Sequence, residues 1–152
     1  MTAHQPITRP VFPPETLATM AALYPLQAGL LHHHLPDHPL LSIEALAQLG
    51  EGLPVSEVEF NPGNVPIGIR PEDIPANGLS IGETIRTIDS NGSWAVLKNI
   101  ENVPAYRTLL MNLLGELRSV VEPQTGAMLT PQGFVFISSP GSITPFNFDP
   151  EH

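Results

Sequence analysis

The stretch FISSPGSITPFNFD, residues 136–149, carries the clearest fold signal in the chain. It continues a β-rich run that begins at Gly133, turns at residues 139–142, and enters a second strand pattern at Ile143. β-branched and aromatic residues favour strands, whereas Pro and Gly mark the turns between them. Because alternate side chains of a strand point to opposite faces, Asn147 and Asp149 are expected on one face, opposite the flanking phenylalanines. The stretch therefore predicts two strands, the second presenting two oxygen-bearing side chains on one side.

Outward from this stretch, apolar spacing divides the chain into helices and a few strands. Helices are expected over residues 15–24, 42–49, 80–89 and 104–120, and strands over residues 55–60, 94–100 and 133–138. Ser80 and Glu83 form a capping-box pattern at the start of the third helix. A wide leucine stripe on the last helix predicts that this face is buried. The chain is therefore expected to be α+β, with its β content rising toward the C-terminal end.

Proline content suggests the domain organisation. Residues 1–14 contain four prolines and are predicted to be an extended arm that packs poorly on the rest. Residues 15–152 are expected to form a single domain. A strand pattern so close to the last residue needs partner strands. We therefore expect this domain to be truncated on its C-terminal side.

The charge balance excludes several classes of partner. The 152 residues include 15 Asp and Glu but only 6 Lys and Arg, for a formal net charge of −9. Nucleic acids and anionic membrane surfaces are bound through clustered Lys and Arg, which this chain cannot supply. The absence of Cys excludes disulfides and cysteine-based metal or catalytic sites. With no apolar run of about 18 residues, the sequence predicts a soluble cytoplasmic protein that does not span a membrane.

Three further groups of residues could carry chemistry: a histidine cluster, a turn-rich loop and a serine cluster. They are His32-His33-His34 with His38, Asn61-Pro-Gly-Asn64, and Ser138-Ser139 with Ser142. The histidine spacing could hold a metal, but apolar flanks and a single nearby carboxylate favour a structural role. The loop matches neither glycine-rich phosphate-binding motif. The serines lack a G-x-S-x-G context, which argues against a serine hydrolase.

The stretch 136–149 resembles the entry to the metal-binding strand of the cupin-like branch of the JmjC hydroxylases. In that family a Ser-Pro or Gly-rich turn leads into a strand with the pattern Thr-Pro-x-His-x-Asp. Four upstream segments also resemble the family's N-terminal half: HPLLSIEAL (38–46), GLSIGETI (78–85), GSWAVLKN (92–99) and PAYR (104–107). The resemblance covers most of residues 28–152. It implies a helical N-terminal part packed on the beginning of an incomplete cupin-like barrel, the double-stranded β-helix.

The resemblance also implies a set of site residues. Asp149 corresponds to the family's carboxylate ligand for Fe(II), and Thr144 to a hydroxyl that contacts 2-oxoglutarate. Asn147 stands where the family has its metal-binding histidine, and an amide oxygen is a much poorer iron ligand than an imidazole nitrogen. His152 is a less suitable substitute, because Pro150 leaves its direction unconstrained. The family's second histidine and its Lys or Arg for 2-oxoglutarate lie beyond the matched residues.

Two functions follow from these observations. The resemblance implies that the full-length protein is a 2-oxoglutarate/Fe(II)-dependent hydroxylase (a dioxygenase) that uses both cofactors, whereas this chain alone is expected to hold neither and to be inactive. The replacement at Asn147 favours a cupin-like binding or regulatory module that has lost its iron site. The sequence leaves open the substrate, a small molecule or a protein, and whether the chain forms a homodimer.

Overall fold

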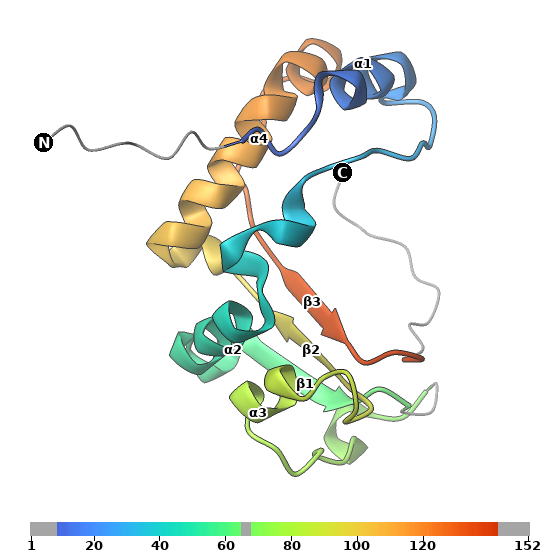
Figure 1. Ribbon diagram of the computed structural model, residues 1–152. Coiled ribbons are helices and arrows are strands. Elements are labelled where there is room, and N and C mark those ends of the chain that lie inside the picture. The colour runs from blue at the N-terminus through green and yellow to red at the C-terminus, as the bar shows by residue number, and fades with distance from the viewer. Residues whose placement is uncertain (1–8, 65–67, 143–152) are drawn as a thin grey trace, which may run out of the picture. The chain divides into compact units, whose positions relative to one another are not determined.

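The computed structural model describes residues 9–64 and 68–142 (Figure 1). Its contacts divide the chain into two compact units, one built from residues 1–41 with 101–132 and the other from residues 42–100 with 133–152. The described residues contain four α-helices and a three-stranded antiparallel sheet, so the expected α+β class is confirmed. In the described part of the chain, no helix is long and apolar enough to cross a membrane.

The second unit contains the sheet. Its strands are β1 (Val58–Pro62), β2 (Ser93–Leu97) and β3 (Val135–Ser138), in the order β1-β2-β3. Ala95 in the central strand is paired with Phe60 on one side and with Ile137 on the other. This antiparallel sheet contains three of the four strands that the sequence predicts, although their ends differ. The fourth, expected from Ile143 to Asp149, lies outside the described residues.

Two helices of the second unit, α2 (Ile43–Gly52) and α3 (Ile81–Arg86), pack together and against the sheet (Figure 1). The approach is close at Gly50, where an added Cβ would lie 2.9 Å from Ile81 Cγ1 and 3.3 Å from Leu97 Cδ2. Leu97 is fully buried on this face of the sheet, and Ile85 of α3 is fully buried beside it. The other face is more open, because Phe136 of β3 is 73% exposed. The core of this unit therefore lies between the two helices and one face of the sheet.

Side-chain and backbone hydrogen bonds set the ends of these elements. The capping box of α3 is confirmed, with Ser80 Oγ accepting from the Glu83 N–H and the Glu83 carboxylate accepting from the Ser80 N–H, both at 3.1 Å. The helix ends three residues earlier than expected, because Asn91 Nδ2 donates to the Thr84 carbonyl at 2.7 Å and stabilises a turn there. Strand β1 begins later than expected because residues 55–57 form a 3₁₀ turn closed by a bond from Glu57 N to Pro54 O. The spacing of apolar residues does not predict these competing local hydrogen bonds, and so it misplaces the ends of the elements.

The first unit is built on α4 (Pro104–Thr125) and α1 (Pro14–Leu23), which pack on each other. Helix α4 runs five residues beyond its expected end and passes through Pro123. A proline this near the end costs a single backbone hydrogen bond, so the helix continues to Gly126, whose φ of +86° suits glycine. Short 3₁₀ turns connect the elements of the described chain: Leu35–Asp37, Pro39–Leu41, Val55–Glu57, Pro71–Asp73 and Ile100–Asn102.

The leucine stripe of α4 is only half-buried, so the prediction that this face is buried is wrong. Tyr106 is the one buried side chain among the described residues of α4, and its hydroxyl donates to the Leu40 carbonyl at 2.7 Å. Within the unit, α4 packs on a helix of ten residues and on the extended chain before it. These short partners cannot cover a helix of 22 residues along its whole length.

The described part of the N-terminal arm, residues 9–13, packs more tightly than expected. Val11 is 8% exposed. The Glu116 carboxylate accepts one hydrogen bond from the Val11 N–H and one from the Phe12 N–H, both at 3.0 Å. The prediction of a loosely packed arm is therefore wrong at Val11 and Phe12, because a carboxylate on α4 satisfies two backbone donors that we expected to be left to water. Arg9 and Pro10 are exposed, as expected.

Candidate functional site

The three residues that the resemblance assigns to the site, Thr144, Asn147 and Asp149, lie outside the described residues, as does His152. Their placement on one face of a strand stays a prediction. The structure does describe the strand and the turn that lead to them, β3 and residues 139–142. The contacts of β3 and of this turn are therefore what the structure shows of the region next to the candidate site.

The turn after β3 is anchored through Ser139, which is 5% exposed. Its N–H donates to the Ser93 carbonyl at 2.8 Å, and its hydroxyl oxygen accepts from the Ser93 N–H at 2.9 Å. The same hydroxyl donates to the Ile88 carbonyl. Two residues on, Gly141 has a φ of +77°, and Ser142 N donates back to Ser139 O at 3.1 Å. These bonds fix the direction in which the chain leaves the sheet.

The end of β1 meets the same turn. Gly63 N donates to the Gly92 carbonyl at 2.6 Å, and a Cβ added to Gly63 would lie 2.5 Å from Ser142 Oγ. A larger residue at position 63 would therefore force the Ser142 hydroxyl to move and would crowd the Gly92 carbonyl at 3.2 Å. The ends of two non-adjacent strands therefore converge on the residues that immediately precede the candidate site.

A partly buried network of polar side chains holds the loops next to this turn. Asn77 Nδ2 donates to Thr84 Oγ1 at 2.9 Å and to Ser93 Oγ at 3.0 Å, and Asn91 Oδ1 accepts from the Ser93 N–H at 3.1 Å. Among the described residues, no buried side-chain nitrogen or oxygen lacks a partner. Each partner of the Ser139 hydroxyl is a backbone group or an amide oxygen, and none of these is a base. The network is suited to holding the loops in place rather than to activating a nucleophile.

The histidine cluster is on an extended segment and the turn that follows it. His32 and His33 are exposed, while His34 and His38 are half-buried. The Nδ1 atoms of His33 and His38 accept hydrogen bonds from the backbone N–H groups two residues further on, at 3.3 and 3.2 Å. These contacts give both rings a local role in shaping the turn. Among the residues that the structure describes, no group of three His, Asp or Glu side chains could hold a metal ion.

Sequence reasoning missed an ion-pair cluster on the surface of the second unit. Arg86 at the end of α3 pairs with Glu44 and Glu51 of α2, at 2.9 and 2.5 Å. Hydrogen bonds from Arg86, and then from Gln48, hold the pKa of Glu44 below its usual value. The same two carboxylates raise the pKa of Arg86. No local signal could reveal this cluster, because Glu44 and Arg86 are 42 residues apart.

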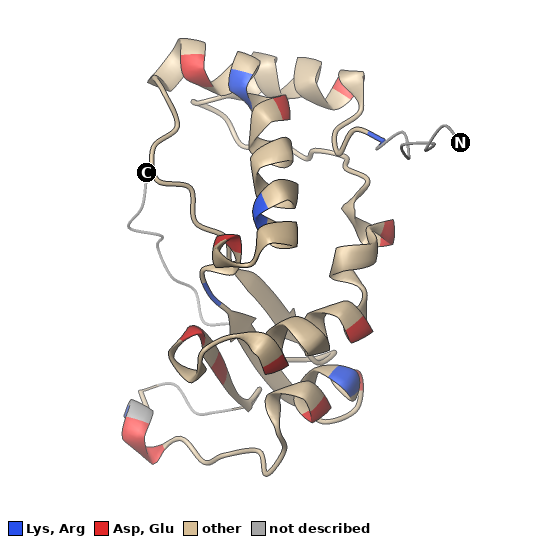
Figure 2. Cartoon of the chain, turned by 90° about the vertical axis from the view of Figure 1, so that its left-hand side faces the viewer, with Lys and Arg blue, Asp and Glu red and all other residues tan. Residues whose placement is uncertain are grey.

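Charge along the described chain is mainly negative. Figure 2 shows Asp and Glu spread over α2, α3 and the loops around them, with few Lys or Arg. Most of the cations are neutralised by carboxylates, as Lys98 is by Glu59 at 2.8 Å. The described surface therefore carries no continuous basic patch.

Comparisons with known proteins give no relative. No protein-family model matches the chain, and neither a curated protein nor a solved structure is significantly similar to it. The function must therefore be argued from the residues themselves.

Proposed function

We propose that this chain forms the N-terminal portion of a cupin-like, JmjC-like protein, and that the full-length protein is a 2-oxoglutarate/Fe(II)-dependent hydroxylase. The proposal rests first on the sequence motif at residues 143–149 and on the four upstream segments that resemble the family. One structural observation supports it most: the turn at residues 139–142, directly ahead of the motif, is held by buried hydrogen bonds.

That anchoring would serve a metal site well, because ligands need a supporting shell that fixes their direction. Strand β3 pairs with the central strand β2, and Ser139 ties its end to Ser93 and Ile88. A strand that follows such a turn starts from a defined position. The role of the described residues in the proposal is therefore to position the motif, and none of them is assigned a chemical step.

The donor set in this chain does not by itself fit Fe(II). The motif supplies the carboxylate of Asp149 and the amide of Asn147, whereas the family pattern has a histidine at position 147. Non-haem iron oxygenases hold iron through two imidazoles and one carboxylate. We therefore derive no catalytic step through iron for these residues.

A second candidate function follows from the same observation. Asn147 favours a cupin-like domain that no longer binds iron and that acts as a binding or regulatory module. The positioning of the motif by β3 and its turn would then serve recognition. The two functions differ in one measurable property, which is the affinity of the full-length protein for iron together with 2-oxoglutarate.

The test is calorimetric titration of the full-length protein, without oxygen, with Fe(II) in the presence of 2-oxoglutarate. It compares the native protein, Asn147→His, and Asn102→His as a control that adds an exposed histidine elsewhere. Binding by the native protein at one site would support the hydroxylase. Binding gained by Asn147→His alone would support the module that has lost its iron. If neither binds, the assignment to this family fails.

A further inference from the structure

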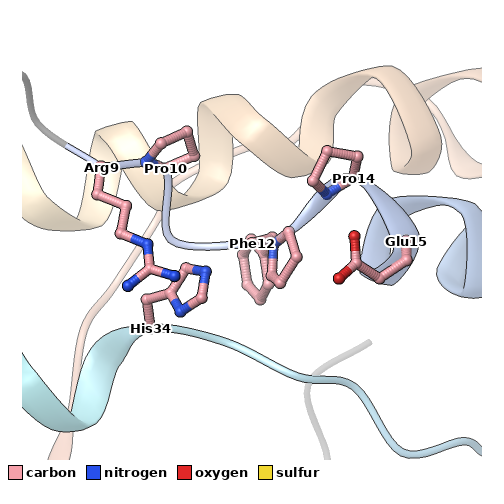
Figure 3. A pocket seen from close by; sticks show the side chains of 7 residues that line it. Arg9, Pro10, Phe12, Pro14, Glu15 and His34 are labelled. Carbon is pink, nitrogen blue, oxygen red and sulfur yellow. The ribbon is translucent and has the colours of Figure 1, made fainter.

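The first unit contains a hollow of about 320 Å³ that no part of the proposed function uses (Figure 3). It is lined by the arm, the start of α1 and one histidine of the cluster: Arg9, Pro10, Phe12, Pro13, Pro14, Glu15 and His34. This volume is at the lower end of the range for small-molecule sites, which is about 300–1,000 Å³. It is large enough for a molecule with a single ring.

The walls of the hollow are held from two directions. On one side, the Glu116 carboxylate accepts from the N–H groups of Val11 and Phe12. On the other side, His34 N donates to the Val11 carbonyl at 2.8 Å, and Thr16 Oγ1 donates to the His32 carbonyl at 2.9 Å. Backbone that is already fixed loses little conformational entropy when a ligand binds. The hollow is thus formed in advance, between two segments tied to each other.

The charges around the hollow are separated. Figure 3 shows the side chains of Arg9 and His34 together on one side of Phe12 and the Glu15 carboxylate on the other. Between them, the lining is apolar, being formed by the Phe12 ring and three prolines. A ligand that fills this space would have an apolar body and an anionic end directed at Arg9.

Arg9 is unusual among the cations of this acidic chain. In the described residues, each of four cations forms an ion pair with a carboxylate, whereas two form none. The paired cations are Arg70, Arg86, Lys98 and Arg118, and the other two are Arg9 and Arg107. Because carboxylates outnumber cations 15 to 6, an arginine without such a partner at a hollow is the group best suited to bind an anion from solution.

We propose that this hollow binds a small monocarboxylic acid with a flat apolar body. The Arg9 guanidinium pairs with the ligand carboxylate through two parallel N–H donors, with the His34 imidazole beside it. The ring of the ligand lies against Phe12 and the prolines. Glu15 at the far end disfavours a second carboxylate. This site shares no residue with the motif at 143–149, so a test of the hollow and a test of the proposed hydroxylase give independent results.

The first experiment titrates the 152-residue chain with phenylacetate and follows the backbone amides of Val11, Phe12 and His34 by NMR. We expect saturable shifts confined to residues that line or adjoin the hollow. Phenylacetamide, which lacks the charge, and 1,4-phenylenediacetate, which adds a carboxylate at the far end, should each bind more weakly. Equal binding of the amide, or no saturable shift with phenylacetate, would overturn the proposal.

Two matched variants test the role of the guanidinium. Arg9→Gln should weaken phenylacetate binding by about tenfold or more, since a charge-assisted hydrogen bond is being removed. Arg107→Gln removes the same charge from the same unit outside the hollow and should leave the affinity unchanged. An unchanged amide spectrum away from the hollow establishes that each variant is folded. Equal losses in both variants would show that phenylacetate responds to net charge and would contradict a site at Arg9.

Discussion

Single side chains hold segments of this molecule that are distant in sequence. Glu116 on α4 reaches the arm more than a hundred residues earlier and accepts from two successive backbone N–H groups. One carboxylate offers two acceptor oxygens, so it can satisfy both donors. This explains why proline spacing alone gave the wrong expectation for Val11 and Phe12, since the partner lies on another element.

We therefore expect Glu116→Gln to destabilise the protein by about 1–2 kcal/mol, because the amide NH₂ group would face a backbone donor. Hydrogen exchange at Val11 and Phe12 should become faster. The control is Glu15→Gln, which removes the same charge from an exposed position in the same unit. Unchanged protection at Val11 and Phe12 in Glu116→Gln would show that the arm is held by packing alone.

Glu44 makes the stability of the second unit depend on pH. Its folded pKa lies below the unfolded value of 4.5, chiefly because of hydrogen bonds from Arg86. A depressed pKa contributes stability that is present above the unfolded pKa and is lost as the pH falls through the folded pKa. Glu44→Gln should thus flatten the fall in unfolding free energy below about pH 4.5. The measurement is urea unfolding as a function of pH, with Glu15→Gln as the control. If the unfolding free energy of Glu44→Gln fell with pH as steeply as that of the native chain, the stabilising role of the Glu44 carboxylate would be contradicted.

At the scale of elements, sequence patterns predicted where structure forms better than where it ends. The capping box at Ser80 and Glu83 is local and was identified correctly, as were the three predicted strands that fall within the described residues. The end of α3 depends on Asn91, a residue that lies beyond the helix and whose amide donates to the Thr84 carbonyl. Helix α4 showed the opposite error, because Pro123 is tolerated in its last turn. Helix ends follow from side-chain competition for carbonyls, which periodicity does not measure.

Burial separates two leucines that look alike in sequence. Leu113 belongs to the half-buried stripe of α4, whereas Leu97 of β2 is fully buried. Leu97→Ala should cost about 2–5 kcal/mol, and Leu113→Ala only about 1 kcal/mol, because a half-exposed site leaves little cavity. Urea unfolding of both variants provides the measurement. An equal or larger loss at Leu113 would show that the stripe is covered in solution.

At the scale of the whole molecule, the α+β class could be predicted, but the division into two units could not. Each unit joins two segments that are separated in the chain, such as residues 101–132 with residues 1–41. Apolar periodicity identifies a buried face but not the element that covers it. The same holds at the candidate site. The motif at 143–149 suggests the ligands, but the residues that hold Ser139 just before it, Ser93 and Ile88, lie 46 and 51 positions earlier in the chain.

The 152-residue chain alone should not catalyse the iron-dependent oxidation of 2-oxoglutarate, because its motif offers poor ligands for iron. Iron-dependent oxidation of 2-oxoglutarate releases succinate and needs iron held firmly with open positions for its co-substrates. This chain offers Asp149 and the weak donor Asn147 in its motif. We therefore expect no iron-dependent succinate from the chain, measured against a reaction without protein. Asn147→His should raise its affinity for Fe(II), because imidazole replaces an amide oxygen, whereas Asn102→His should not. Succinate formed by the native chain above that background would show that Asn147 does not prevent catalysis, and the argument for an iron-free module would fall with it.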